Sequence, residues 1–377
     1  MYIPFNKPYF SGKELDYIGD ALATGHLSGN GKYTKYCHKF FEERYNIKKS
    51  LLTTSCTDAL EMAAILIDIK PGDEVIVPSF TFVSTALAFA RQSAVIRFVD
   101  SRTDHPGMDE DLIEILINEK TRAIVPVHYA GVACDMDKIM TLAAKYNLYV
   151  IEDTAHGIEG SYKSRPLGSI GHFGCFSFHE TKNIQCGEGG MLTINDDHFI
   201  ERAEIIWEKG TNRSQFFRGD VAFYEWKDTG SSFLPSELNA AFLFAQLESV
   251  KVIQNKRLHL WHRYDDGFKD LQKEDFVKVT EIPEYASING NSFYLVCQNR
   301  KKRDGLILYL SEYGILVLSH FLPLHKSQYY SQKHDGRQLK MSELYAETLV
   351  RFPVFHELTD SQVDEIITRS INFLSRP

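Results

Sequence analysis

The feature that most constrains the fold of this chain is a regular alternation of short apolar runs with helical stretches. Five runs between residues 50 and 151 have strand character and are apolar throughout, at 50–53, 74–77, 94–99, 123–127 and 148–151. Stretches with helical periodicity separate them, at 56–69, 82–92, 109–119 and 136–146. Strands buried on both faces are typical of α/β proteins, in which helices cover a mostly parallel sheet. We therefore expect such a sheet, with ligands beyond the carboxyl ends of its strands.

The rest of the chain predicts two unequal domains. Helical stretches precede the alternation at 12–24 and 33–46, and strands at 173–178 and 190–195 with a helix at 197–208 follow it. Helices are expected over 235–272, and the last part mixes a strand at 293–297 with helices at 303–312 and 359–374. A chain of 377 residues is long enough for two substantial cores. We expect a large domain over residues 1–250 and a smaller C-terminal α+β domain over residues 251–377.

Composition narrows the class of function. The chain is 44% hydrophobic and 24% charged, which is ordinary for a folded protein, and its net charge of -8 argues against binding nucleic acid or anionic membranes. Six cysteines occur without CxxC pairs, so neither a disulfide framework nor a zinc site is expected. The N-terminus has no apolar signal segment, and no stretch reaches the roughly 20 apolar residues of a membrane span. We expect a cytoplasmic protein with a small-molecule partner and no metal.

A lysine lies where the apolar run at 173–178 ends. Lys182 stands between Thr181 and Asn183, and the glycine-rich segment GEGG follows at 187–190. An amine held partly out of water at a strand end loses proton affinity and can attack an aldehyde or ketone. A surface lysine followed by a glycine turn is the alternative.

Polar or aromatic residues follow three other predicted strands. Thr57 lies at a strand-to-helix junction, where free backbone N–H groups suit a phosphate, although Ser55 and Asp58 there also fit a plain capping box. Phe82 ends the segment PSFTF, which is typical of core packing or of stacking on a planar cofactor. Asp153 follows a buried strand and needs either a positive partner, such as a protonated pyridine nitrogen, or a turn to cap.

Two polar segments are candidates for substrate contacts. The loop at 209–219 contains Lys209 and Arg213 among amides and aromatics, which suits a diphosphate and a nucleoside base, although a solvated loop has the same composition. His320 and His325 lie five residues apart with a proline between them, so they do not share a helical face. We expect them to hydrogen-bond a substrate and not to bind a metal. No GxGxxG follows the first strand, which disfavours a nucleotide-redox function.

The motifs SCTDAL, PSFTF, EDTAH and SFHETKN followed by GEGG occur in an order that resembles a known family. Over nearly its whole length the chain is similar to the DegT/DnrJ/EryC1/StrS sugar aminotransferases. This resemblance implies the aspartate-aminotransferase fold (type I) and the cofactor pyridoxal 5'-phosphate (PLP). It implies that Lys182 binds PLP covalently and moves a proton, and that Asp153 pairs with the pyridine nitrogen. The remaining implied contacts are His156 with the phenolic oxygen, Phe82 with a ring face, and Thr57, the backbone of Asp58 and Ser177 with the phosphate.

The sequence departs from the wider family pattern at two positions. His156 stands where many members have Gln, which preserves a hydrogen bond but alters its pH dependence. Ser232 stands where the wider pattern supplies an Asn to the phosphate from the partner subunit, so a weaker or water-mediated contact is expected. Some members with His in place of the lysine act as dehydratases, and the presence of Lys182 therefore favours transamination.

The resemblance also implies a substrate and an assembly. We expect a homodimer with active sites at its interface, which moves an amino group from glutamate to the C4 ketone of TDP-4-keto-6-deoxyglucose. The product would be a TDP-4-amino-4,6-dideoxy sugar, of galacto configuration, for surface polysaccharide or O-antigen synthesis. Two alternatives stay open. One is a C3 aminotransferase acting on a TDP-3-keto-6-deoxy sugar, and the other is a non-catalytic regulatory protein that binds PLP or a nucleotide sugar.

Overall fold

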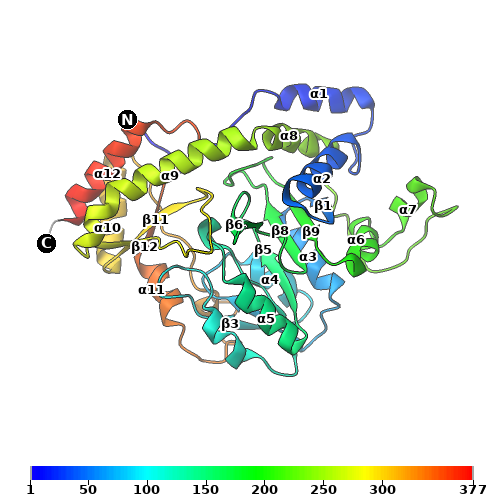
Figure 1. Ribbon diagram of the computed structural model, residues 1–377, viewed down its shortest axis with the longest axis horizontal. Coiled ribbons are helices and arrows are strands. Elements are labelled where there is room, and N and C mark those ends of the chain that lie inside the picture. Colours follow the sequence, from blue (N-terminus) through cyan, green and yellow to red (C-terminus); the bar gives the residue numbers. More distant parts are fainter. Residues whose placement is uncertain (1, 376–377) are drawn as a thin grey trace.

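A seven-stranded sheet forms the centre of the larger part of the molecule (Figure 1). The computed structural model describes residues 2–375. The strand order is β1-β9-β8-β5-β4-β2-β3, and only β9 runs antiparallel to its neighbours. The bounds are β1 (Lys49–Thr53), β2 (Glu74–Pro78), β3 (Val95–Val99), β4 (Thr121–Ile124), β5 (Tyr149–Asp153), β8 (Phe173–Ser177) and β9 (Gly190–Ile194). The predicted mostly parallel sheet is therefore confirmed.

Helices bury both faces of this sheet, as the apolar strands require. One face packs against α3 (Cys56–Leu66), α4 (Ser84–Ala90) and α6 (Ile200–Trp207), and the other against α2 (Lys32–Tyr45), α5 (Met136–Tyr146) and α8 (Glu237–Glu248). Alternate strand residues divide between the two cores. Leu51 of β1 packs with α3, for example, while Leu52 packs with α2 and α8. Helix α1 (Glu14–Thr24) lies against α8.

A second core surrounds a small antiparallel sheet. Its strands are β10 (Val277–Val279), β11 (Phe293–Cys297) and β12 (Leu349–Phe352), and α9 (Val250–Lys273), α10 (Arg300–Glu312) and α12 (Asp360–Leu374) contribute to the core. Helix α11 (Lys340–Thr348) contacts β11 and β12. Helix α9 belongs to both parts, because Ile253 packs under α8 and Leu260 packs in the second core (Figure 1). Ile3 also lies in the second core and pairs with Ile315, unlike the expected assignment of residues 1–250 to one domain. The domain boundary near 250 stays a prediction.

Three expected elements differ in the structure. The segment 109–119, expected as one helix, forms two short 3-10 turns, Glu110–Leu112 and Glu114–Leu116. The carboxylate of Glu110 is buried there and accepts hydrogen bonds from Arg102 and the amide of Asp135, and these tertiary contacts outweigh helical periodicity. The helical stretch 235–272 is broken at Ser249 into α8 and α9. Strand β4 ends at Ile124, because Pro126 has no N–H for the ladder.

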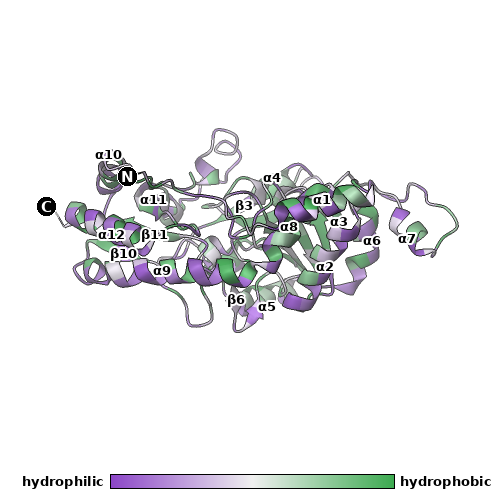
Figure 2. Cartoon of the chain, turned by 90° about the horizontal axis from the view of Figure 1, so that it is seen from above, coloured by the Kyte–Doolittle hydropathy of each residue, from purple (hydrophilic) through white to green (hydrophobic). Residues whose placement is uncertain are grey.

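The remaining elements are short. They are the hairpin β6 (Ser161–Tyr162) and β7 (Arg165–Pro166), the helix α7 (Arg213–Arg218), and 3-10 turns at Tyr129–Gly131, Asp197–Phe199 and Leu324–Lys326. Helix α7 projects from the body of the molecule in both views (Figures 1 and 2). All six cysteines are buried and unpaired. Within residues 2–375, no helix has both the length and the apolar character needed to span a bilayer.

Candidate active site

A cavity of about 830 Å³ lies where the carboxyl ends of the central strands face the small sheet. The large sheet and its helices contribute Thr57, Asp153 and Lys182 to its lining, and the other side contributes His320 and Arg351. The cavity therefore lies at the edge where the strand pattern predicts a ligand site.

The Lys182 side chain reaches this cavity from the turn after β8. Its amide donates to the carbonyl of His179 (2.9 Å), which fixes the backbone, whereas its amine has no hydrogen bond or ion pair with any residue in the range 2–375. Burial lowers the pKa of Lys182 from 10.5 to about 8; the negative charge of Asp153 opposes this shift and the positive charge of Arg351 adds to it. About a tenth of this amine is therefore neutral and nucleophilic at pH 7, and about half at pH 8.

Asp153 is the last residue of β5 and is almost fully buried. Its Oδ2 accepts a hydrogen bond from Thr85 Oγ1 (2.7 Å), and its Oδ1 accepts one from the amide of Ala155 (3.1 Å). Burial raises the pKa of Asp153, and these two hydrogen bonds act in the opposite direction. No cation in the part of the chain that the structure describes pairs with this carboxylate. Its charge is thus available to a positively charged ligand group.

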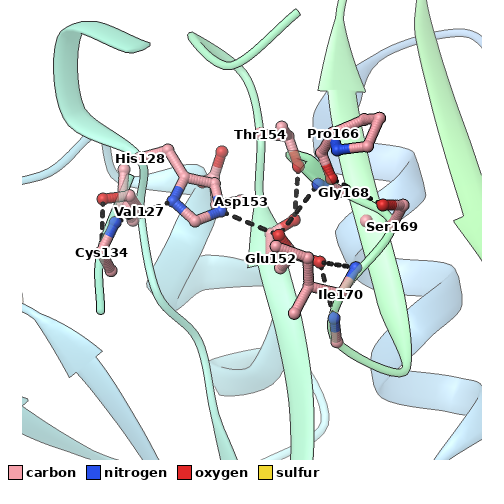
Figure 3. Close-up of polar contacts among 12 residues, drawn as sticks. Val127, His128, Cys134, Glu152, Asp153, Thr154, Pro166, Gly168, Ser169 and Ile170 are labelled. Carbon is pink, nitrogen blue, oxygen red and sulfur yellow. Dashed lines mark hydrogen bonds and ion pairs between the residues drawn. The ribbon is translucent and has the colours of Figure 1, made fainter. Parts of the chain in front are cut away.

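The adjacent acid, Glu152, points to the opposite face of the sheet (Figure 3). Its carboxylate accepts four hydrogen bonds, from His128 Nε2 (3.0 Å) and from the amides of Gly168 (2.9 Å), Ile170 (2.8 Å) and Gly171 (2.7 Å). The amide of Cys134 donates to His128 Nδ1 (3.2 Å), so the ring proton is assigned to Nε2 and the imidazole is neutral. Glu152 is therefore an ionised carboxylate held by dipoles, and this network fixes the end of the strand that carries Asp153.

The turn at 128–131 orients two further histidines of the cavity. Tyr129 Oη bonds His320 Nδ1 (2.6 Å), and the amide of Ala130 donates to His156 Nδ1 (3.2 Å). Burial lowers the pKa of both His156 and His320 well below the usual value. Their rings stack 6.1 Å apart at 17°. The cavity wall therefore presents two neutral imidazoles that can exchange hydrogen bonds with a ligand.

The start of α3 has the donors that an oxyanion needs. The first amides of a helix have no intrahelical acceptor, and the hydroxyls of Thr57 and Ser84 (2.7 Å apart) and of Ser177 lie on the same cavity. Gly190 lets the sheet approach closely, because a Cβ there would lie 2.3 Å from the carbonyl carbon of Ser55. The Asp58 amide, expected at the phosphate, instead donates to Ser55 Oγ (3.1 Å), so the capping interpretation applies to that group.

The other predicted site residues divide between the cavity and the rest of the molecule. Phe82 lines the cavity rim, 58% exposed, and His320 lines the wall. His325 does not line the cavity, which corrects the expected substrate contact: its buried ring bonds Ser79 Oγ (2.7 Å) and Glu343 Oε1 (3.2 Å).

Three predicted residues lie near α7 and away from the cavity of their own chain. Arg213 lies over the ring of Phe217 (5.1 Å) and 3.9 Å from Glu208, the Lys209 amide donates to the carbonyl of Ser231, and Ser232 pairs with Glu208 in an isolated bridge. None of the three lines this cavity.

Sequence reasoning did not select several residues that line or support the cavity. They are Phe5, Thr85, Tyr129, Arg257 and Arg351. The sequence does contain an indication that Arg351 has a functional role, because it is a charged residue within the apolar run 349–352. Its Nη2 donates to the carbonyl of Ser319 (3.3 Å), and its buried Nε has no partner within residues 2–375. A guanidinium without a carboxylate partner gives this side of the cavity an affinity for anions.

Known proteins share the sequence pattern and the fold of this chain. Residues 8–370 match the model of the DegT/DnrJ/EryC1/StrS aminotransferase family. The spore coat polysaccharide biosynthesis protein SpsC of Bacillus subtilis is 30% identical over 376 residues, which cover 97% of this chain and 95% of that protein. A putative sugar aminotransferase of Streptococcus pneumoniae, solved in its PMP form, is 25% identical with a TM-score of 0.90 and 99% of each chain covered. An aminotransferase of Psychrobacter cryohalolentis is 26% identical with a TM-score of 0.92, covering 99% of this chain and 98% of that one.

Proposed function

Because the chain belongs to the DegT/DnrJ/EryC1/StrS aminotransferase family, we propose that it transfers an amino group from glutamate to the C4 ketone of TDP-4-keto-6-deoxyglucose. The family is PLP-dependent, and the Streptococcus pneumoniae relative is known in a PLP form and a PMP form. The protein is accordingly a PLP-dependent sugar aminotransferase. The identity of the sugar, the carbon that receives the nitrogen and the glutamate donor are the proposed parts.

The residues of the cavity fit PLP. The amine of Lys182 makes no hydrogen bond or ion pair within residues 2–375 and suits an aldehyde. The buried carboxylate of Asp153, which forms no ion pair within the same range, suits a protonated ring nitrogen. The start of α3 with the hydroxyls of Thr57 and Ser177 suits a phosphate, and Phe82 offers a ring face. The observation that carries the proposal is that one cavity holds an amine of lowered pKa and a buried acid, and that neither forms an ion pair within residues 2–375.

Each side chain has a defined task in this scheme. Bound PLP supplies a ring that accepts the electrons left on a carbon when a proton is removed. Asp153 keeps the ring nitrogen protonated, because its charge favours the cationic form. Lys182, with a pKa of about 8, can take a proton from the carbon that bears the reacting nitrogen and return it. The guanidinium of Arg351 suits a carboxylate of the amino donor, and His320 suits a hydroxyl of the sugar.

The finer assignment to a 4-keto-6-deoxy sugar nucleotide is supported by the ordered motifs of the sequence and by the name of SpsC, which refers to polysaccharide synthesis. A C3 aminotransferase requires the same cofactor chemistry and differs only in how the sugar lies. The expected role in surface polysaccharide or O-antigen synthesis, and the cytoplasmic location, are part of this proposal.

The segment around α7 supports a homodimer. It projects from the body (Figures 1 and 2) and exposes Phe217 (66%), Phe223 (70%) and Trp226 (82%). Several exposed aromatic side chains on one projecting segment are typical of a protein interface. In a homodimer this segment would bring Lys209, Arg213 and Ser232 to the partner's cavity, as the family pattern implies for Ser232.

The test is incubation of the PLP-loaded protein with glutamate and TDP-4-keto-6-deoxyglucose, followed by NMR of the product. A 4-amino-4,6-dideoxy sugar of galacto configuration is expected. A 3-amino product from the TDP-3-keto sugar alone would favour the C3 alternative. If glutamate leaves the visible absorption of the bound cofactor unchanged, the protein is a silent binder and the proposed function is wrong.

A further inference from the structure

A cluster of buried amide side chains lies beside the cavity, next to Lys182, and one of its members, Asn291, lines the cavity. Its members are Asn183 (3% exposed), Gln254 (7%), Asn289 (0%) and Asn291 (8%). They come from the lysine turn, from α9 and from the segment before β11. None of them carries a charge, and none serves the proposed chemistry directly. The name amide clasp is used below for these four residues.

Asn289 is the hub of the amide clasp. Its Nδ2 donates to the backbone carbonyls of His156 (2.6 Å) and Ile158 (2.8 Å). The backbone carbonyl of Asn289 accepts from Asn183 Nδ2 (3.0 Å) and from Gln254 Nε2. Its Oδ1 accepts from the amide of Asn291 (3.0 Å). One residue thus connects the loop that carries His156, the turn that carries Lys182 and the long helix α9.

The remaining bonds complete this network. Asn291 Nδ2 donates to Asn183 Oδ1 (3.0 Å), so the side chain of Asn183 is held on both its donor and its acceptor group. Arg257 of α9 donates from Nε to the carbonyl of Gly290 (3.0 Å) and from Nη2 to that of Asn291 (2.8 Å). A Cβ at Gly131 would lie 1.9 Å from Asn289 Oδ1, so the turn that orients His320 and His156 also packs on the hub. A buried polar network whose members are this fully bonded is rigid.

The amide clasp matters for Lys182 because no protein group within residues 2–375 bonds its amine. The amine makes no hydrogen bond or ion pair within residues 2–375, which leaves the side chain able to move between a ligand carbon and its resting position. The backbone of Lys182 must then be held by contacts outside the cavity, so that the amine lies at the correct distance from the reacting carbon. The adjacent residue, Asn183, provides that attachment by bonding the backbone carbonyl of Asn289, whose side chain in turn bonds the carbonyl of His156.

We propose that Asn289 is a positioning residue for proton transfer. Its side chain fixes its own backbone against the loop of His156, and its backbone carbonyl holds Asn183, which keeps the backbone of Lys182 in register with His156. This inference rests on the proposed function for its kinetic part. Loss of the clasp displaces the amine without removing any group that touches substrate. A displacement of about 1 Å lowers the rate of a positioned reaction by about 100-fold.

The kinetic test compares N289A with N195A as a matched control. Asn195 likewise donates from Nδ2 to two carbonyls, of Gly168 (3.0 Å) and Gly171 (2.9 Å), but lies away from the cavity. With glutamate and the keto sugar, N289A is expected to lower kcat by about 100-fold with KM for both substrates within about threefold of the parent. N195A is expected to have a kcat within about threefold of that of the parent protein. With glutamate deuterated at its α-carbon, the isotope effect on kcat should rise in N289A only, because proton transfer becomes more rate-limiting.

A second readout requires neither cofactor nor substrate. The pH dependence of acetylation of Lys182, followed by peptide mass spectrometry, should have its midpoint near 8 in the parent and in N195A. In N289A the midpoint should rise toward 10.5, because a loosened turn lets the amine reach water. If the parent fails to transaminate but this midpoint still moves, the proposed function fails and the positioning role stands.

The proposal is overturned if N289A and N195A lose the same small factor in kcat and both keep the midpoint near 8. Should N289A not fold, N183A removes instead the bonds that the lysine turn makes with the backbone carbonyl of Asn289 and with the side chain of Asn291, and it is expected to lower kcat by about tenfold with the same change in isotope effect. An N183A variant with the kcat, isotope effect and labelling midpoint of the parent would also overturn it.

Discussion

The end of β5 separates two regions in which buried charged groups have opposite surroundings: on one side they are fully hydrogen-bonded, and on the other they have few partners. Behind the sheet, Glu152 is fully buried and its carboxylate accepts four hydrogen bonds (Figure 3). In the cavity, Asp153 accepts two hydrogen bonds but forms no ion pair with any described residue. The amine of Lys182 and the Nε of Arg351 have no hydrogen-bond partner in the same part of the chain. Buried polar groups are normally satisfied, so the first region is scaffold and the second is adapted to a ligand. The predictions below test this contrast.

The largest effect is expected from removing the amine. Lys182→Ala should lower amino transfer by on the order of 10⁴-fold, because it removes both the nucleophile and the base. The melting temperature of the ligand-free protein should not fall, because the substitution removes a buried amine that forms no ion pair within residues 2–375. Retention of more than about one hundredth of the parent rate would show that another group performs the transfer.

The two neighbouring acids should respond in opposite ways. Asp153→Asn should lower the rate by about 1000-fold with little loss of stability, because the amide cannot keep a ring nitrogen protonated. Glu152→Gln should lower the free energy of unfolding by about 3 kcal/mol, because an NH₂ group then faces backbone N–H donors, and should keep the rate per folded molecule within about tenfold. Urea titration and steady-state kinetics measure both quantities. Similar profiles for the two variants would contradict the division into scaffold and site.

The pKa of Lys182 sets a pH dependence. Below about pH 8 the rate at which the ligand-free protein binds PLP should fall by about tenfold per pH unit, because only the neutral amine reacts, and above it the rate should level off. Because the pKa is lowered in the folded state, the unfolded chain binds more protons between about pH 8 and 10.5, so this group favours folding more as the pH rises through that window. Stopped-flow absorbance gives the rate, and a profile with a midpoint near 10.5 would contradict the burial of this amine.

The smallest effect is expected at the two histidines. His320→Ala should raise KM for the nucleotide sugar by about tenfold, the worth of one hydrogen bond, because His320 lines the cavity. His325→Ala should leave that KM unchanged and lower the melting temperature, because His325 bridges Ser79 and Glu343 in the interior. Equal increases in KM for the two variants would indicate that the imidazole rings of both histidines contact the substrate.

The sequence predicted what depends on local pattern. The apolar runs and helical periods gave the parallel sheet, and the positions of Asp153 and Lys182 after two strands put them at one edge. Residues whose role depends on distant contacts were not accessible in this way. Asn289 is bonded to segments more than 100 residues away, and His325 is separated from Ser79 by 246 positions. No local signal distinguishes His325 from His320, because only tertiary packing decides which of them meets the cavity.

The central claim is that a covalent bond between Lys182 and PLP forms across the cavity from Asp153. Borohydride reduction of the PLP-loaded protein, followed by peptide mass spectrometry, tests it most directly. The account predicts that the reduced cofactor is found on the peptide that contains Lys182, and that Lys182→Ala abolishes this label. A label on another lysine, or no label at all in a protein saturated with PLP, would contradict the account.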